Sequence, residues 1–109
     1  MTSAHTPTKF HERVYAELRK VPHGKVTTYK HLAKSVGSKA YRAVGTAMNK
    51  NPYSFADGGN VPCHRVVNSD GKVGKFASGT ENKIKILIKE GIPIKDGKIT
   101  DLKRYLYKF

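Results

Sequence analysis

Two helical segments separated by a single glycine place the tightest limit on how this chain can fold. The first can be capped by Thr27 or Thr28, and Gly37 is typical of the residue that follows the end of a helix. The second can be capped by Ser38 and extends to about Asn49. Their apolar residues recur at helical spacing: Leu32, Ala33 and Val36, then Ala40, Ala43, Val44, Ala47 and Met48. Two amphipathic helices joined by a tight turn predict a helix-turn-helix over about residues 28–49.

The second helix also has a face without any apolar side chain, formed by Arg42, Gly45, Thr46 and Asn49. A slim polar face with one arginine is typical of the recognition helix of a DNA-binding helix-turn-helix. Gly45 costs about 1 kcal/mol of helix stability relative to alanine. Close approach of DNA would explain this glycine, and close helix–helix packing would explain it equally well. A helical hairpin without any role in DNA binding would show the same pattern.

Charge separates these alternatives only in part. The chain carries 21 Lys and Arg against 8 Asp and Glu, a formal net charge of +13. With 109 residues, 38% of them hydrophobic, it can form one compact domain over residues 1–109. So basic a domain indicates a polyanionic partner, with nucleic acid favoured over an anionic membrane surface. A merely soluble basic protein is the third interpretation.

Targeting signals are not apparent in the sequence. No apolar run reaches the length that crosses a bilayer, and the first residues lack the basic and apolar segments of a signal peptide. We therefore expect an intracellular protein without a membrane partner, in the nucleus if eukaryotic and in the cytoplasm if prokaryotic.

The rest of the chain predicts a mainly α fold with small β hairpins. A first amphipathic helix begins at Thr6-Pro7 and ends near Lys20, with Phe10, Val14 and Leu18 inward. After a loop at residues 53–60, two hairpins are expected: Arg65–Asn68 with Lys72–Phe76 around Asp70-Gly71, and Ile92–Ile94 with Lys98–Ile99 around Asp96-Gly97.

A helix is expected between the two hairpins. Ser78 and Glu81 form a capping box for it, Gly91 ends it, and three apolar residues point inward, Ile84, Leu87 and Ile88. A short last helix should carry Leu102, Tyr105, Leu106 and Phe109.

The tetrapeptide Pro62-Cys63-His64-Arg65 contains the only cysteine. A single cysteine excludes an internal disulfide and argues against a cysteine-based zinc site, so we expect neither a metal nor a cofactor. A nucleophilic thiol needs an environment that lowers its pKa, and a helical turn starting at Pro62 would supply N–H groups near Cys63. His64 offers a base and Arg65 a positive charge. The alternative is that Cys63 is a small buried hydrophobe.

Four blocks of the sequence together resemble the O6-alkylguanine-DNA alkyltransferases, also called methylated-DNA–protein-cysteine methyltransferases. The resemblance runs from about Phe10 to Gly91. The blocks are Pro22 to Tyr29, Arg42-Ala43-Val44-Gly45 through Asn51-Pro52, Pro62 to Val67, and Lys83 to Gly91. It implies a winged helix-turn-helix-like domain for DNA binding and catalysis, with the active-site loop and hairpin at about residues 61–76. A separate N-terminal domain of many members is absent, so the chain resembles a minimal form.

The resemblance assigns catalytic roles to four residues. Cys63 would accept the alkyl group from O6 of guanine and keep it, so that each protein molecule acts once. His64 would take the thiol proton through a water, and Glu90 would orient His64. An acid in the last turn of a helix opposes the helix dipole, and Glu90 therefore also needs a partner. Asn51 would tie the recognition helix to the active-site loop.

The resemblance also implies how DNA is held. The target nucleotide must leave the base stack. Arg42 matches the arginine finger that replaces it, and Tyr29 the tyrosine that presses on the adjacent phosphate. Thr28, Ala43 and Gly45 would lie against the minor groove, whose narrowness suits small residues. The expected partner is duplex DNA containing O6-alkylguanine, bound by a monomer.

The base pocket implied by the family departs from its usual pattern. Its residues are Val66, Val67, Phe76, Ala77 and Ser78. The family often has tyrosine and serine where this chain has Phe76 and Ala77, so a hydroxyl and a donor to O6 are lost. The loop at residues 53–61 is also longer than typical.

Two other functions compete with alkyl transfer. Alkyltransferase-like proteins bind alkylated guanine and mark it for excision repair, and they usually replace the cysteine with tryptophan or alanine. This chain keeps Cys63, which favours transfer. A plain DNA-binding regulator is the third hypothesis, and it leaves Pro62-Cys63-His64-Arg65 without a purpose.

Overall fold

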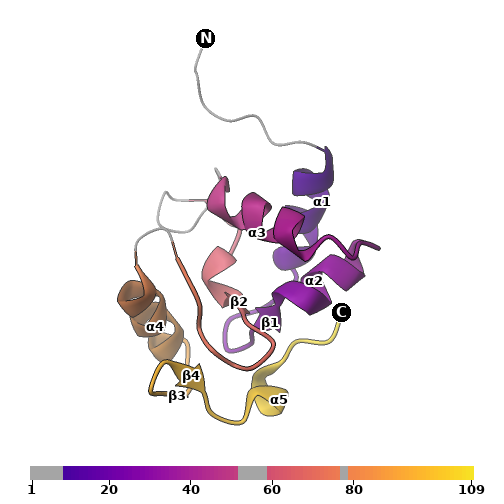
Figure 1. The fold of residues 1–109 in the computed structure, drawn as a ribbon. Coiled ribbons are helices and arrows are strands. Elements are labelled where there is room, and N and C mark those ends of the chain that lie inside the picture. Colours follow the sequence, from indigo (N-terminus) through magenta and orange to yellow (C-terminus); the bar gives the residue numbers. More distant parts are fainter. Residues whose placement is uncertain (1–8, 52–58, 77–78) are drawn as a thin grey trace.

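Three helices form the first half of the molecule. The computed structural model describes residues 9–51, 59–76 and 79–109. Helices α1 (Lys9–Leu18), α2 (Tyr29–Ser35) and α3 (Tyr41–Asn49) pack on one another, as Figure 1 shows. The core between them includes Val14, Leu18, Leu32, Val44 and Ala47. The buried Tyr15 hydroxyl donates a hydrogen bond of 2.7 Å to the Ala47 carbonyl and so joins α1 to α3.

The turn between α2 and α3 has the predicted form. Thr28 caps α2, because its Oγ1 accepts a hydrogen bond from the His31 N–H at 3.1 Å. Gly37 has a φ of 72°, a left-handed conformation that glycine adopts without strain. Its N–H bonds the Lys34 carbonyl while the Ser38 N–H bonds the Ala33 carbonyl, a Schellman ending.

The expected start of the recognition helix is wrong by two residues. Helix α3 begins at Tyr41, and Ala40 occupies the N-cap position without a side-chain cap. Ser38 Oγ instead accepts from the Ala40 N–H at 2.9 Å. Its hydroxyl therefore stabilises the turn before the helix, and Ala40 lies outside the helical stripe. Val44 and Ala47 form the buried part of that stripe.

The first predicted hairpin is also wrong. Strand β2 (Val66–Val67) pairs in parallel with β1 (Thr27–Thr28), in the register Thr27 with Val66 and Thr28 with Val67. At the Asp-Gly turn the Asn68 N–H donates to the Lys72 carbonyl and the Gly71 N–H to the Asn68 carbonyl, both at 2.9 Å, but among the described residues no pairing of the two predicted strands continues from it. Both valines are fully buried, as is typical of a parallel pair covered on both faces, and this outweighs the local Asp-Gly signal.

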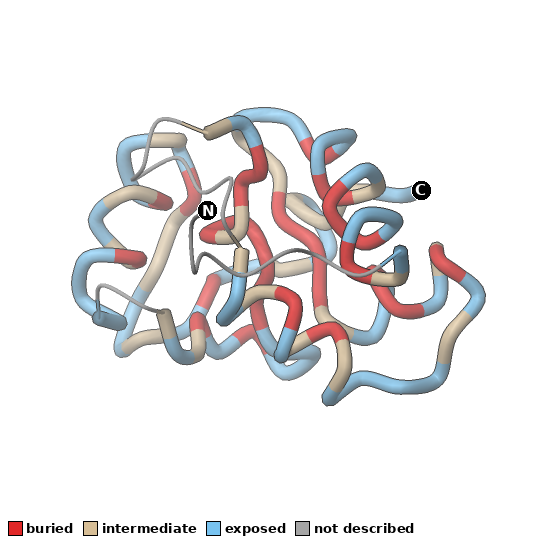
Figure 2. Tube along the Cα trace, turned by 90° about the horizontal axis from the view of Figure 1, so that it is seen from above, coloured by how far each residue is buried: buried red, intermediate tan, exposed pale blue. Residues whose placement is uncertain are grey.

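The second half of the chain packs around its own apolar cluster. It contains α4 (Thr80–Lys89), the antiparallel pair β3 (Ile94–Lys95) and β4 (Lys98–Ile99), and α5 (Leu102–Tyr105). Here the predicted hairpin is confirmed, and Asp96 and Gly97 both have positive φ in its two-residue turn. In Figure 2 the buried stretches follow the inner sides of the helices and the extended segments between them. The cluster consists of Val26, Val67, Val73, Leu87, Ile92 and Ile99.

Helix α4 differs from its prediction at both its start and its inner face. Gly79 is its N-cap residue, without a side-chain cap, and Ser78 lies outside the described residues. Ile88 is 52% exposed, whereas Lys83 is fully buried beside the turn that carries Leu87. The buried face of the helix is therefore centred about one residue earlier in the sequence than the positions of its apolar residues predicted. Gly91 ends it as expected, with a φ of 86°.

The two ends of the chain agree with the predictions only in part. The expected cap at Thr6-Pro7 lies outside the described residues, and α1 ends at Leu18. The last helix stops at Tyr105, because Leu106 turns into a β-bridge with Val26. Among the described residues, no helix has the length and apolar character needed to cross a membrane.

Candidate active site

Cys63 occupies the first position of a single 3₁₀ turn, η2 (Cys63–Arg65), directly before β2. The sequence predicted a turn that starts at Pro62; Pro62 is instead the N-cap residue, one position before the turn. The backbone N–H of Cys63 donates to the Val61 carbonyl and that of Arg65 to the Pro62 carbonyl, both at 2.9 Å. The turn is therefore short, and the backbone N–H groups of Cys63 and His64 also interact with the Cys63 thiol, as expected from the sequence for a turn at this position.

The pKa of the Cys63 thiol is raised, contrary to the expectation of a lowered value. Burial is the main cause, because it disfavours the thiolate. A hydrogen bond from the Asn51 side chain, the charge of Lys83 and the backbone N–H groups of Cys63 and His64 act in the opposite direction without outweighing burial. The resting thiol is therefore neutral, and its reaction as a nucleophile requires a base.

A buried ion-pair network lies behind the cysteine. His64 Nε2 is 2.9 Å from Oε2 of Glu90, the C-cap residue of α4. Arg65 binds the same carboxylate through Nε to Oε1 at 2.9 Å and Nη2 to Oε2 at 2.7 Å. Its Nη1 donates to the Val21 carbonyl at 3.0 Å. The sequence implied the contact between His64 and Glu90, but it missed Arg65 as the partner that the misplaced acid needs.

The network sets the protonation states of its members. Burial lowers the pKa of His64, and the hydrogen bond and charge of Glu90 only partly oppose this, so the imidazole is neutral near pH 7. Burial alone would raise the pKa of Glu90, but hydrogen bonds from Arg65 and His64 outweigh it and lower the pKa. The ionised carboxylate can only accept, so His64 Nε2 carries the proton and Nδ1 is the basic nitrogen.

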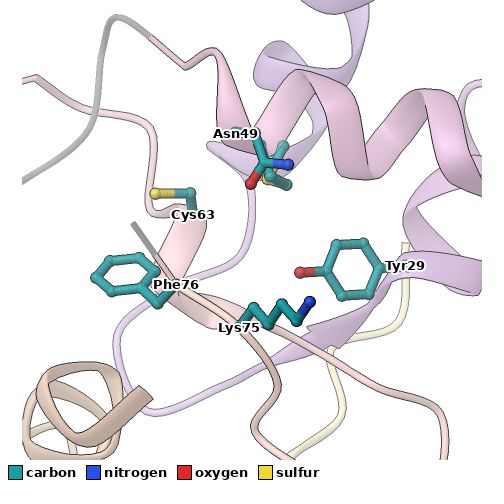
Figure 3. A pocket seen from close by; sticks show the side chains of 6 residues that line it. Tyr29, Asn49, Cys63, Lys75 and Phe76 are labelled. Atoms are coloured by element: carbon teal, nitrogen blue, oxygen red, sulfur yellow. The ribbon is translucent and has the colours of Figure 1, made fainter. Parts of the chain in front are cut away.

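Figure 3 shows the pocket that the cysteine faces. Its volume is about 30 Å³, enough for one or two waters. It is lined by Tyr29, Met48, Asn49, Cys63, Lys75 and Phe76. A wider depression of about 380 Å³ shares Tyr29, Asn49 and Lys75 with it and reaches Gly45 on α3. The cysteine pocket therefore adjoins the recognition helix. Burial raises the pKa of Tyr29, and the charge of Cys63 in its thiolate form adds to this.

A buried lysine of this site is not apparent in the sequence. Lys83 is fully buried, and its Nζ donates to the Val66 carbonyl at 2.7 Å and lies 3.4 Å from the Lys75 carbonyl. Burial lowers its pKa to about 8, although the charge of Cys63 in its thiolate form acts to raise it. The sequence did offer one sign of its burial: Lys83 precedes the inward Leu87 by four residues and so lies on the same face of α4. Lys83 fastens the pocket segment around Lys75 to β2.

Of the residues expected to contact DNA, those on α3 are accessible and Thr28 is buried. Arg42 is exposed on α3, and a Cβ built on Gly45 would meet no atom of the described chain within 4 Å. Helix packing therefore does not explain Gly45. Ala43 is half-buried, whereas Thr28 is 1% exposed and its hydroxyl is occupied with His31. Thr28 caps a helix and does not lie on the surface.

The structure brings only part of the expected base pocket together. Phe76 lines the pocket with Cys63, and Asn51 reaches the thiol through its side chain. Val66 and Val67 are buried in the core and are not among the lining residues. Ala77 and Ser78 lie outside the described residues. Over the described part of the chain, no group of three His, Cys, Asp or Glu side chains could hold a metal ion.

Comparison with known proteins places this arrangement in a family. Residues 9–92 match the family described as 6-O-methylguanine DNA methyltransferase, DNA binding domain. The chain belongs to this family. The resemblance and the predicted fold class, mainly α with small β hairpins and a helix-turn-helix, are thereby confirmed.

Relatives in the alkyltransferase family match most of this chain over about half of their own length. Methylated-DNA–protein-cysteine methyltransferase of Methanosarcina barkeri is 46% identical over 77 residues, 70% of this chain and 46% of the relative. That of Metallosphaera sedula is 48% identical over 86 residues, 79% of this chain and 51% of the relative. The chain spans about half the length of these enzymes.

Solved structures agree in fold. The crystal structure of S. pombe Atl1 in complex with damaged DNA containing O6-carboxymethylguanine matches with a TM-score of 0.79 and 32% identity, over 95% of this chain and 99% of that chain. O6-methylguanine-DNA methyltransferase from Pyrococcus kodakaraensis matches with a TM-score of 0.69 and 45% identity, over 78% of this chain and 47% of that chain.

Proposed function

We propose that this protein repairs duplex DNA by transferring the alkyl group from O6 of guanine to Sγ of Cys63. One observation carries the proposal: Cys63 lines a pocket beside α3, and the next residue, His64, is hydrogen-bonded to the carboxylate of Glu90. A nucleophile, a base and a group that orients the base are the parts this reaction needs. The relatives named methylated-DNA–protein-cysteine methyltransferase support the same chemistry.

The first step is loss of the thiol proton. Its raised pKa keeps Cys63 neutral, so His64 Nδ1 acts as the base while Glu90 holds Nε2–H. Neighbouring side chains in a turn point in different directions, and a water bridging Sγ and Nδ1 would carry the proton. Arg65 keeps Glu90 ionised and fixed, and thereby keeps His64 in the reactive tautomer.

The second step is an in-line displacement. The thiolate forms a bond to the O6-alkyl carbon, the carbon–O6 bond breaks, and its electron pair stays on O6. The proton lost by the thiol ends on guanine. Cys63 keeps the alkyl group as a thioether, so one protein molecule repairs one lesion.

Access of the base requires rearrangement. The present pocket is too small for a purine, and its lining residues Lys75 and Phe76 lie outside helices and strands. We propose that the target nucleotide turns out of the duplex, that Arg42 fills the gap, and that Tyr29 lies against the adjacent phosphate. The exposed face of α3, open at Gly45, would enter the minor groove.

We further propose that residues 1–109 act as one unit and as a monomer, and that no cofactor takes part. We place this activity in the nucleus of a eukaryote or the cytoplasm of a prokaryote, where a thiol stays reduced.

Mass spectrometry tests the proposal directly. Incubation with a duplex oligonucleotide containing O6-methylguanine should add one methyl mass to the peptide that holds Cys63, at most once per molecule. Cys63→Ala should bind the duplex and remain unmodified. Tight binding of the lesion by the wild type without any mass change would reject transfer and support recognition of alkylated guanine in the manner of an alkyltransferase-like protein. Sequence-dependent binding that ignores the lesion would support a regulator.

A further inference from the structure

The described residues that line the Cys63 pocket include one positive charge and no acidic side chain. Lys75 lines both this pocket and the wider depression beside α3. In Figure 3 its ammonium group extends toward the Tyr29 hydroxyl. Among the described residues that line either cavity, none is an aspartate or glutamate. An empty pocket of this kind has a positive potential.

The side chain of Lys75 is exposed, and neighbouring residues anchor its backbone. The backbone of Lys75 is fastened by the buried ammonium group of Lys83, which lies 3.4 Å from its carbonyl and also bonds Val66. Lys83 itself interacts electrostatically with Cys63. The acid of the site, Glu90, is occupied by Arg65 and His64 and is not a partner of either lysine.

We propose that Lys75 makes this pocket selective for O6 substituents that end in a carboxylate, such as carboxymethyl, over neutral substituents of the same size. The inference rests on the proposed alkyl transfer and deepens it by naming the class of lesion. Lys75 is a specificity-determining residue in this scheme. It acts on the substituent and not on the thiol proton.

The chemistry explains why a cation is needed for such a lesion. A thiolate that approaches a carbon next to a carboxylate brings two negative charges together, which raises the barrier to displacement. An ammonium group beside the carboxylate compensates for part of this repulsion, and solvent screens the rest of its effect because Lys75 is exposed. The bonds formed and broken are those of methyl transfer: the sulfur–carbon bond forms, the carbon–O6 bond breaks, and the thiol proton ends on guanine. The product is S-carboxymethyl-Cys63.

A pair of isosteric lesions isolates the effect of charge. Carboxymethyl and carbamoylmethyl groups have the same number of heavy atoms and nearly the same shape, but only the first is negative. Single-turnover rates are measured with duplexes that contain O6-carboxymethylguanine or O6-carbamoylmethylguanine at the same position. The ratio of the two rates in one protein cancels differences in DNA affinity.

Three variants are compared with the wild type. Lys75→Gln removes the charge and keeps much of the stem, Lys75→Arg keeps the charge, and Lys72→Gln removes an exposed lysine that does not line the pocket. We expect the wild type to favour the carboxymethyl lesion, and the ratio to fall roughly threefold to tenfold in Lys75→Gln. Lys75→Arg and Lys72→Gln should keep the ratio near that of the wild type.

The outcomes separate this inference from the function on which it rests. Equal rates with both lesions, or a ratio unchanged in Lys75→Gln, would overturn charge selection while normal transfer from O6-methylguanine left alkyl transfer intact. A ratio that fell equally in Lys72→Gln would show a general charge effect and also overturn the role of Lys75. Lack of transfer from every lesion, O6-methylguanine included, would overturn both proposals.

Discussion

Arg65 holds both carboxylate oxygens of Glu90, with Nε 2.9 Å from Oε1 and Nη2 2.7 Å from Oε2. This pair explains how an acid is tolerated at the C-terminal end of α4, where its charge opposes the helix dipole. The third contact of Arg65, to the Val21 carbonyl, extends the link to the segment that follows α1. One arginine thus connects three segments and positions the partner of His64.

Removing this arginine should destabilise the fold. Arg65→Met leaves Glu90 ionised and nearly buried without its main partner, and we expect the free energy of unfolding to fall by about 3 kcal/mol. Urea titration followed by circular dichroism measures it. Arg104→Met, at an exposed position of α5, is the matched control and should change little. Equal losses in both variants would contradict the structural role of the pair.

The rate of alkyl transfer should fall in acid. His64 must be neutral to act as a base, and burial lowers its pKa, so the midpoint should lie below about 6.5, the ordinary value for histidine. In Glu90→Gln the contribution that raises this pKa is lost, so the midpoint should move to still lower pH. The maximal transfer rate at high pH should also fall about tenfold, because the glutamine amide would not select one tautomer of His64 as the carboxylate does. Rates from single-turnover experiments between pH 5 and pH 8, roughly the range in which His64 titrates, measure both effects. An unchanged midpoint would exclude His64 as the titrating base.

Lys83 should make the protein more stable in mild alkali. Its pKa is lowered to about 8, so above this pH the unfolded chain binds more protons than the native state, and stability rises with pH. The rise should extend from about pH 8 toward the ordinary lysine value of about 10.4. Urea titrations across this range should show it in the wild type and not in Lys83→Met. Lys85→Met, an exposed position on the same helix, should retain it.

Gly45→Ala should separate stability from DNA binding. The added methyl meets no atom of the described residues outside its own helix, so the helix should gain about 0.5 to 1 kcal/mol from the better propensity of alanine. Affinity for duplex DNA should fall, because the methyl occupies the face that we assign to the minor groove. Thermal unfolding and fluorescence anisotropy measure the two effects. Gly37→Ala is the control that should lose stability, since its φ is 72°. If Gly45→Ala bound DNA as tightly as the wild type, the minor groove would not contact this face of α3.

Arg42→Ala should weaken repair in duplex DNA far more than reaction with the free alkylated base. The side chain is exposed on α3 and is not among the residues that line the cysteine pocket. Its proposed task, to fill the gap left by the extruded nucleotide, exists only in a duplex. Second-order rates with a duplex and with free O6-alkylguanine supply the comparison. Equal losses with both substrates would remove the role of Arg42 as a finger.

Local features were predictable from the sequence wherever a backbone conformation depends on a few neighbouring residues. Gly37 and Gly91 end helices, Thr28 caps α2, and Asp96-Gly97 forms a hairpin turn. Each of these signals reports the φ and ψ angles or the hydrogen bonds of residues close in the chain. The motif around Cys63 also indicated the family without any coordinates.

Tertiary contacts decided what these signals could not. Val66 and Val67 pair with a strand nearly forty positions earlier, and the Asp-Gly turn beside them gave no sign of this. The exposed Ile88 and the buried Lys83 exchange their expected places because the orientation of α4 is set by its neighbours.

The Pro62-Cys63-His64-Arg65 motif shows the same division in the chemistry of the site. The sequence by itself determined that a lone cysteine stands beside a base and a cation within a domain that has a helix-turn-helix. Only the tertiary structure decided that burial raises the pKa of this thiol, that Arg65 serves Glu90, and that Lys75 faces the pocket. Desolvation and ion pairing depend on which distant atoms surround a group, and those atoms come together only when the chain folds.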